Sequence, residues 1–123
     1  MRLKNILLVV SDIEKSKAFY KELFGLQVIT DFGENVMLTE GLVLQEKKVW
    51  DDAIGRESVL GGHAAELYFE ENNLDMFLER LEAGGFSVEL LNRECTHAWG
   101  GRALRLYDPD GHVIEVAVNG EAK

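Results

Sequence analysis

The sequence predicts an α+β fold built from two copies of one β-α-β-β-β module. Three observations predict it. The order of strand-like and helix-like segments in residues 1–48 recurs in residues 62–119, and the two helices also match in letters, as AFYKELFGLQV and MFLERLEAGGFSV show. Such self-similarity is typical of two supersecondary units that share a core. The length of 123 residues suits a single domain that holds both copies.

The first module is expected at about residues 1–48. LKNILLVV (3–10) is a short aliphatic strand, and SDIEKSKAFYKELFG (11–25) is an amphipathic helix that Ser11 or Asp12 caps and Gly25 ends. Three short strands follow in LQVIT, NVMLTE and LVLQEK. The stretch KKVWDDAIGRESVLGG is polar and contains glycine, which indicates an irregular linker loop at about residues 49–61.

The second module is expected at about residues 62–119. HAAELYFE (63–70) alternates like a strand, and NNLDMFLERLEAGG (72–85) is a helix that Asn72 or Asn73 caps and two glycines end. FSVELL, GRALRLY and HVIEVAV complete the module. A tight turn, DPDG (108–111), joins the last two strands, because proline fixes φ and glycine accepts a positive φ.

Composition and charge restrict the classes of partner. The formal net charge of −9 argues against a surface that follows nucleic-acid phosphates. The one cysteine, Cys95, cannot form an internal disulfide and has no basic cluster nearby, which indicates an inert thiol. The early apolar run ILLVV is too short for a leader or a membrane span. We therefore expect a cytoplasmic protein with neither a membrane nor a nucleic-acid partner.

Three long stretches resemble one known superfamily. VVSDIEKSKAFYKELFGLQV, AELYFEENNLDMFLERLEAGGFSV and WGGRALRLYDPDGHVIEV are similar to the glyoxalase, bleomycin-resistance and extradiol dioxygenase proteins, which are also called vicinal-oxygen-chelate (VOC) proteins. The resemblance covers nearly the whole chain. It implies that the two modules form an open, U-shaped, barrel-like sheet around a cleft for a small molecule. It also implies a homodimer.

The resemblance implies four cleft positions, one on the first and one on the last strand of each module. They correspond to Asn5, Gln45, Glu66 and Glu115, of which Gln45 matches least securely. Strand alternation supports two of them independently, because it places Glu66 and Glu115 away from the aliphatic face of each strand. Both carboxylates are therefore expected to face the cleft.

The departure from the superfamily pattern bears on metal binding. In metal-using members of the superfamily, the set of metal ligands contains histidine. The resemblance places Asn5 and Glu66 of this chain at positions where histidines usually stand. Imidazole suits zinc, nickel and iron, while carboxylates and amides suit magnesium or manganese. The sequence therefore predicts no tightly held transition metal and argues against a ring-cleaving dioxygenase. Glu66 and Glu115 are the candidates for a weakly held Mg²⁺ or Mn²⁺.

Two neighbouring carboxylates need compensation, because like charges disfavour double ionisation. The alternatives are a retained proton, a cationic ligand, or an arginine from the strand before the last, either Arg102 or Arg105. Aromatic side chains are candidates for the walls of a ligand site, with ordinary packing in a loop or core as the alternative. These candidates are Trp50, Tyr68, His97 and Trp99.

Three functions of different classes fit these residues. The first is a metal-independent binder, similar to bleomycin-resistance proteins, that takes a cationic, planar small molecule in an acidic cleft. The second is a glyoxalase-type lyase or isomerase that uses Glu115 and Glu66 as bases on a small carbonyl compound, with or without a weakly held divalent ion. A third is an interaction domain whose cleft has lost its function. The lack of histidine favours the binder.

Overall fold

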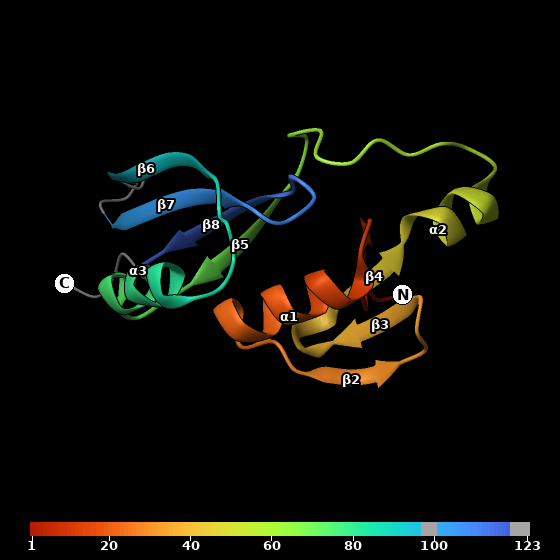
Figure 1. Cartoon of the computed structure of the whole chain (residues 1–123), viewed down its shortest axis with the longest axis horizontal. Helices are drawn as coiled ribbons and strands as arrows, with labels where there is room; N and C mark the ends of the chain where they lie inside the picture. Colours follow the sequence, from red (N-terminus) through yellow and green to blue (C-terminus); the bar gives the residue numbers. More distant parts are fainter. Residues whose placement is uncertain (97–100, 119–123) are drawn as a thin grey trace. The chain divides into compact units, whose positions relative to one another are not determined.

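The computed structural model describes residues 1–96 and 101–118, with residues 93–96 described by their backbone alone. The chain divides into two compact units, Met1–Leu60 and Gly61–Lys123, called the first unit and the second unit below. Figure 1 shows the elements of both. Those of the first unit are β1 (Ile6–Val10), α1 (Ile13–Phe24), β2 (Val28–Asp31), β3 (Asn35–Leu38), η1 (Thr39–Gly41), β4 (Leu42–Glu46) and α2 (Lys47–Ile54). Those of the second are β5 (Glu66–Glu70), α3 (Leu74–Ala83), β6 (Leu90–Thr96), β7 (Arg102–Tyr107) and β8 (Val113–Ala117).

The two sheets have the same topology. The first has the strand order β1-β4-β3-β2 and the second β5-β8-β7-β6. β1 runs parallel to β4 in the first sheet, and β5 runs parallel to β8 in the second. The remaining pairs are antiparallel. The prediction of an α+β fold from two β-α-β-β-β modules is therefore confirmed.

Helix α1 of the first unit has the predicted bounds and caps. Asp12 is the N-cap, and its Oδ1 accepts a hydrogen bond from the Lys15 backbone N–H at 3.1 Å. Gly25 ends α1 in the left-handed conformation, with φ of 73°. The buried face of α1 includes Phe19, Tyr20 and Leu23, and α1 contacts β3 and β4. This apolar face fixes one side of the first sheet as the core of its unit.

The helix of the second unit also begins as predicted, at the N-cap Asn73, whose Oδ1 accepts from the Met76 backbone N–H at 3.0 Å. Leu74 and Phe77 are its buried residues. In β7 and β8 one face carries buried aliphatic side chains, namely Leu104, Leu106, Ile114 and Val116. The opposite face of β7 and β8 carries Arg105 and Glu115.

Residues 47–54 differ from the sequence prediction, because this part of the expected linker loop forms helix α2. Two lysine–aspartate pairs at i, i+4 lie along it: Lys47 with Asp51 at 2.6 Å and Lys48 with Asp52 at 3.5 Å. Gly55 then ends the helix with φ of 67°. The polar composition that suggested a loop is the charged surface of a short helix.

Two strands of the second unit begin later than expected. β5 begins at Glu66 because His63, at the start of the predicted strand, has a φ of +63°. β6 spans Leu90–Thr96 instead of residues 86–91, because its partner β7 pairs Leu106 with Leu90 and Arg102 with Thr96. Within the described ranges, no helix combines the length and the apolar character that crossing a membrane requires.

Candidate functional site

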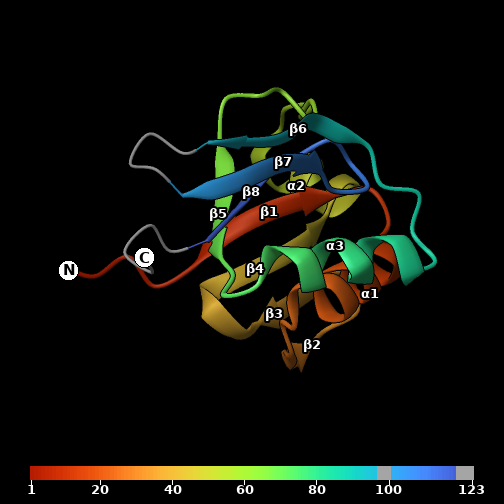
Figure 2. The same ribbon diagram turned by 90° about the vertical axis from the view of Figure 1, so that its left-hand side faces the viewer.

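Three charged side chains from three strands meet on one face of the second sheet. In the β7–β8 pair, Arg105 lies directly opposite Glu115, and in the β5–β8 pair Tyr68 lies opposite Glu115. Since side chains alternate along a strand, Glu66 shares this face with Tyr68. Figure 2 shows β7 beside β8 in this sheet. We call Glu66, Arg105 and Glu115 the Arg105 cluster.

The guanidinium of Arg105 joins the two carboxylates. Its Nε donates to Glu66 Oε1 at 2.8 Å, and its Nη2 donates to Glu115 Oε1 at 3.0 Å. Both bonds are charge-assisted, so each is stronger than a hydrogen bond between neutral groups. The sequence predicts two carboxylates in the site, Glu66 and Glu115. The structure brings both of them to one cation, the guanidinium of Arg105.

Burial explains why Glu115 needs this cation. Its side chain is 5% exposed, against 30% for Glu66 and 34% for Arg105. A buried carboxylate without a partner would hold its proton or destabilise the fold. Arg102, the other arginine considered from the sequence, instead donates to Asp75 at 3.0 Å, and both of these side chains are exposed. Of these two arginines, Arg105 is thus the one that pairs with Glu66 and Glu115.

The surroundings of the cluster remain negative. Glu70 lies on the same face of β5 as Glu66 and Tyr68. Desolvation, followed by the charges of Glu115, Glu70 and Glu66, raises the pKa of the Tyr68 hydroxyl. Tyr68 is 46% exposed and stays neutral, so it presents an aromatic ring with a hydrogen-bond donor beside the carboxylates.

The turn after β7 sets the register of the cluster. Asp108 is buried, and its Oδ1 accepts from the backbone N–H groups of Asp110 and His112, each at 2.9 Å. Gly111 has a φ of 87°, as the DPDG motif predicts. The hairpin that results pairs Tyr107 with Val113 and, two residues further on, Arg105 with Glu115.

A second polar contact near this face was missed from the sequence. His63 Nε2 and the Tyr107 hydroxyl are 2.8 Å apart, and the two rings meet edge to face. Tyr107 lies on the face of Arg105, two residues further along β7. The hairpin register could have predicted that Tyr107 lies on the same face as Arg105. Nothing in the sequence indicates the positive φ of His63.

The two predicted positions of the first unit have different surroundings. Asn5 lies just before β1 and is half-buried near Gly41. Gln45 is buried in β4 and its amide is used within the unit: Oε1 accepts from Asn35 Nδ2 at 2.7 Å, and Nε2 donates to the Glu34 carbonyl at 3.0 Å. These bonds hold the β3–β4 hairpin, a role for which Asn35 was not singled out from the sequence. A place for Asn5 and Gln45 in a shared cleft stays a prediction.

The aromatic candidates divide into three cases. Tyr68 lies on the face of the Arg105 cluster. Trp50 is half-buried in α2 of the first unit. His97 and Trp99 lie outside the described residues.

The Arg105 cluster does not fit a tightly held transition metal. Its donors are carboxylate oxygens, and one oxygen of each already accepts from Arg105. A guanidinium keeps its charge at any ordinary pH and would repel a metal ion beside it. Among the side chains that the structure describes, those of residues 1–92 and 101–118, no group of three or more His, Cys, Asp or Glu is arranged for a metal ion.

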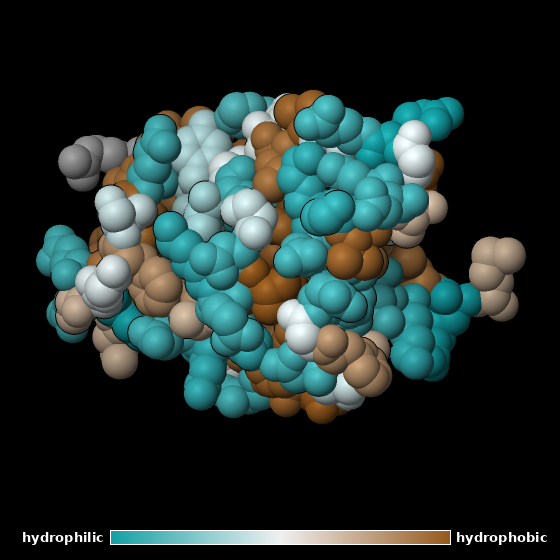
Figure 3. Space-filling view, turned by 45° about the vertical axis from the view of Figure 1, so that its right-hand side comes forward, coloured by the Kyte–Doolittle hydropathy of each residue, from teal (hydrophilic) through white to brown (hydrophobic). Residues whose placement is uncertain are grey.

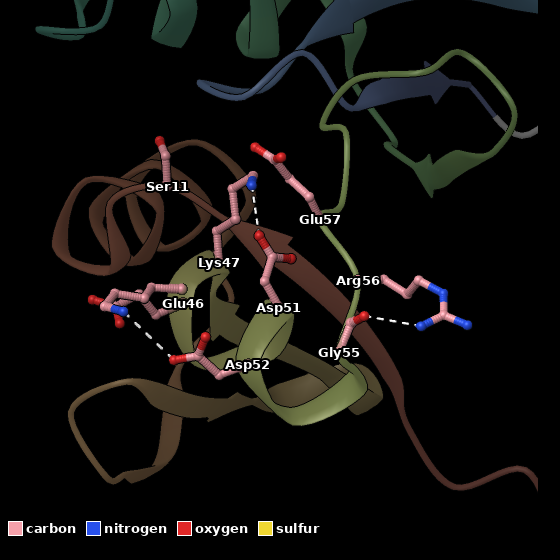
Figure 4. A pocket seen from close by; sticks show the side chains of 9 residues that line it. Ser11, Glu46, Lys47, Asp51, Asp52, Gly55, Arg56 and Glu57 are labelled. Atoms are coloured by element: carbon pink, nitrogen blue, oxygen red, sulfur yellow. Dashed lines mark hydrogen bonds and ion pairs between the residues drawn. The ribbon is translucent and has the colours of Figure 1, made fainter.

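An open pocket of about 740 Å³ lies in the first unit, around α2 and the loop that follows it. Figure 4 shows two contacts among its lining residues: Lys47 pairs with Asp51, and Arg56 donates to the backbone carbonyl of Gly55. Asp51 also accepts from the Ser58 hydroxyl at 2.6 Å, and Lys47 and Ser58 together lower its pKa to about 2. The bonds of Asp51 to Lys47 and Ser58 join the loop to α2.

Hydrophilic side chains cover most of the face drawn in Figure 3, with hydrophobic ones between them.

Comparisons with known proteins agree with the fold. The glyoxalase-like domain family matches residues 3–120. Glutathione transferase FosA of Serratia marcescens is 28% identical over 119 residues, which cover 94% of this chain and 79% of that protein.

Two solved structures are similar over most of the chain. A protein of unknown function from Agrobacterium tumefaciens is 34% identical with a TM-score of 0.82, covering 97% of this chain and 94% of its own. A glyoxalase-related enzyme from Fulvimarina pelagi is 26% identical with a TM-score of 0.81, covering 97% and 88% respectively. The chain belongs to the glyoxalase-like domain family.

Proposed function

We propose that the protein binds a cationic, planar small molecule at the Arg105 cluster, without a tightly held transition metal. The observation that carries this proposal is the pair of bonds from Arg105 to Glu66 and Glu115, at 2.8 and 3.0 Å. These bonds hold two carboxylates on one face of the sheet. The guanidinium of Arg105 is the cation that the buried Glu115 requires. Glu70 adds a further negative charge to that face.

The exposures of the side chains suit a ligand. Glu66 is 30% exposed, and a carboxylate accepts several hydrogen bonds, so a ligand ammonium can share it with Arg105. The ring of Tyr68, 46% exposed, offers a face for stacking and for a cation–π contact. Asn5, Gln45, Trp50, His97 and Trp99 stay proposed contacts of the same ligand.

A thermal-shift screen tests the binder. The compounds are cationic planar aromatics, each paired with a neutral analogue of the same shape, and the protein is kept in a metal chelator. We expect the cationic member of a pair to raise the melting temperature, because a ligand that binds only the folded state stabilises it. The shift should become smaller in Glu66→Gln, which keeps the shape of the side chain and removes its charge.

Arg102→Gln is the matched control. It removes an arginine from the same strand, whose ion pair with Asp75 is exposed. The shift produced by the cationic compound should be unchanged in this variant. Equal shifts from the cationic and neutral members of every pair would contradict the proposal, as would a cationic shift that Glu66→Gln leaves intact.

An enzymatic function is the second candidate. The relative FosA is named a glutathione transferase, and the guanidinium of Arg105 lies where it could stabilise an oxyanion formed beside Glu66. Glu66, the more exposed carboxylate, would then remove a proton α to a carbonyl. Turnover of a hemithioacetal by the purified protein, together with no stabilisation by any cationic compound, would replace the binder by this enzyme.

The assembly and the location of the protein are also proposals. We infer that the protein is a cytoplasmic homodimer. We also infer that residues 1–123 of each chain form a single domain. Light scattering of the purified chain should give the mass of a dimer, and a monomer at all concentrations would contradict it.

A further inference from the structure

The bonds from Arg105 to Glu66 and Glu115 leave from one edge of its guanidinium. Nε and Nη2 form the side of the planar group that usually holds the two oxygens of a single carboxylate. Here Nε donates to Glu66 and Nη2 to Glu115, so two carboxylates from two strands flank the place of one cation. Without Arg105, this place would have two negative groups side by side.

The backbone holds this arrangement in place. Glu115 and Arg105 are directly opposite in the β7–β8 ladder, and β5 pairs with the other side of β8. The side chain of Glu115 is 5% exposed, so little water lies around its carboxylate to offset the charge. Loss of the arginine would therefore leave an electrostatic demand for a proton or for another cation.

We propose that Arg105 is the resident cation of this site, and that it excludes divalent metal ions from Glu66 and Glu115. Replacing it with a neutral residue should convert the same face into a binding site for a hard divalent cation, of which Mn²⁺ and Mg²⁺ are the kinds that carboxylates prefer. This inference deepens the metal-independent part of the proposed function and makes no assumption about the organic ligand.

Titration with Mn²⁺ tests it. Wild type, Arg105→Gln, Arg105→Lys and Arg102→Gln are each titrated after removal of metals, and binding is followed by calorimetry and by thermal shift. We expect Arg105→Gln to bind Mn²⁺ at least about tenfold more tightly than wild type, a gain of about 1.4 kcal/mol. Arg105→Lys keeps a cation and should gain nothing. Arg102→Gln exposes one carboxylate that is already in water, so it should gain nothing either.

The double variant Arg105→Gln with Glu115→Gln locates the gain. It should lose the Mn²⁺ affinity of the single variant, because one of the two carboxylates is now neutral. A folded Arg105→Gln that binds Mn²⁺ no better than wild type would overturn the inference. So would a gain of the same size in Arg102→Gln.

Wild type provides a measurement that does not depend on the folding of any Arg105 variant. It should show no saturable Mn²⁺ binding at the cluster. Stoichiometric binding by wild type that Glu115→Gln abolishes would show that the arginine gives way to the metal, and would overturn the inference. Failure of the cationic aromatic compounds to bind wild type would leave these metal results unchanged, so the two proposals can fail separately.

Discussion

Glu115 is a carboxylate in the middle of a buried strand, and its partner is decided by strand register. Arg105 faces it directly across the β7–β8 ladder, and the guanidinium reaches on to Glu66 in bonds of 2.8 and 3.0 Å. The cluster is asymmetric, because Glu115 is 5% exposed and Glu66 is 30% exposed. The buried acid therefore supports the fold, while the exposed acid is available to a ligand.

This asymmetry predicts different effects of two matched substitutions. Glu115→Gln should lower the free energy of unfolding by about 1–3 kcal/mol, because it removes a buried charge-assisted hydrogen bond. Glu66→Gln should lower it by less than about 1 kcal/mol, since the lost ion pair is partly exposed. Urea denaturation of both variants measures the difference. A loss in Glu66→Gln that equals or exceeds that in Glu115→Gln would contradict the assignment.

At the scale of elements, helix α2 and its following loop are held by one carboxylate. Asp51 accepts from Lys47 Nζ at 2.6 Å and from the backbone N–H and hydroxyl of Ser58 at 3.0 and 2.6 Å. Its pKa in the folded protein is about 2, below the ordinary 3.8, and Lys47 is the first cause of this shift. The folded state therefore binds the proton less readily than the unfolded state does.

The sign of this shift predicts a pH dependence. A lowered pKa in the folded state contributes stability that is present above about pH 3.8 and is lost as the pH falls towards 2. Asp51→Asn should therefore be less stable than wild type near neutral pH, and the difference should shrink as the pH passes from 3.8 to 2. Denaturation curves at several pH values measure it. Asp52→Asn, which loses only an exposed 3.5 Å pair, should show a small difference.

Two glycines with similar φ provide a second prediction for the elements. Gly25 has a φ of 73° and open space around its missing side chain, whereas a Cβ on Gly61, with a φ of 72°, would lie 2.9 Å from the Asp110 carbonyl oxygen. Gly25→Ala should destabilise by about 1 kcal/mol from the left-handed conformation alone. Gly61→Ala should destabilise by clearly more, since two backbone segments must move apart. Thermal denaturation compares them, and equal losses would contradict the close approach.

Much of this architecture could be predicted from the sequence, because it depends on local signals. The caps Asp12, Asn73 and Gly25, the DPDG turn and the alternation of β5 and β8 lie where the residue types require them. Helix α2 was missed because its glycine and its charges resemble a loop; the spacing of Lys47 and Asp51 was the available signal. The strand register of the β7–β8 hairpin decides that Arg105, and not Arg102, pairs with Glu115. This register can be obtained by counting residues outward from the DPDG turn. The pairing of Gln45 with Asn35 had no local signal.

For the whole molecule, the net charge of −9 is the property that bears most on ligand choice. The negative potential around an acidic protein raises the local concentration of cations and lowers that of anions. Combined with the carboxylates of the Arg105 cluster, it favours a cationic guest. The repeated topology of the two units supplies the scaffold.

This charge predicts that binding depends on salt. The affinity for a cationic aromatic compound should fall as the salt concentration rises from about 0.01 to 1 M, because the screening length shrinks from about 30 to about 3 Å. The affinity of a neutral analogue should change little over this range. Calorimetric titrations at several salt concentrations measure both, and a salt-independent affinity for the cation would contradict an electrostatic contribution.

The most direct test of metal-independent binding at the Arg105 cluster is a calorimetric titration of a cationic planar compound into wild type and Glu66→Gln, both in excess chelator. We predict saturable binding to wild type under these conditions, and binding to Glu66→Gln that is weaker by about tenfold or more. Binding that disappears in chelator and returns with a divalent ion would contradict the account, as would equal affinity for the two proteins.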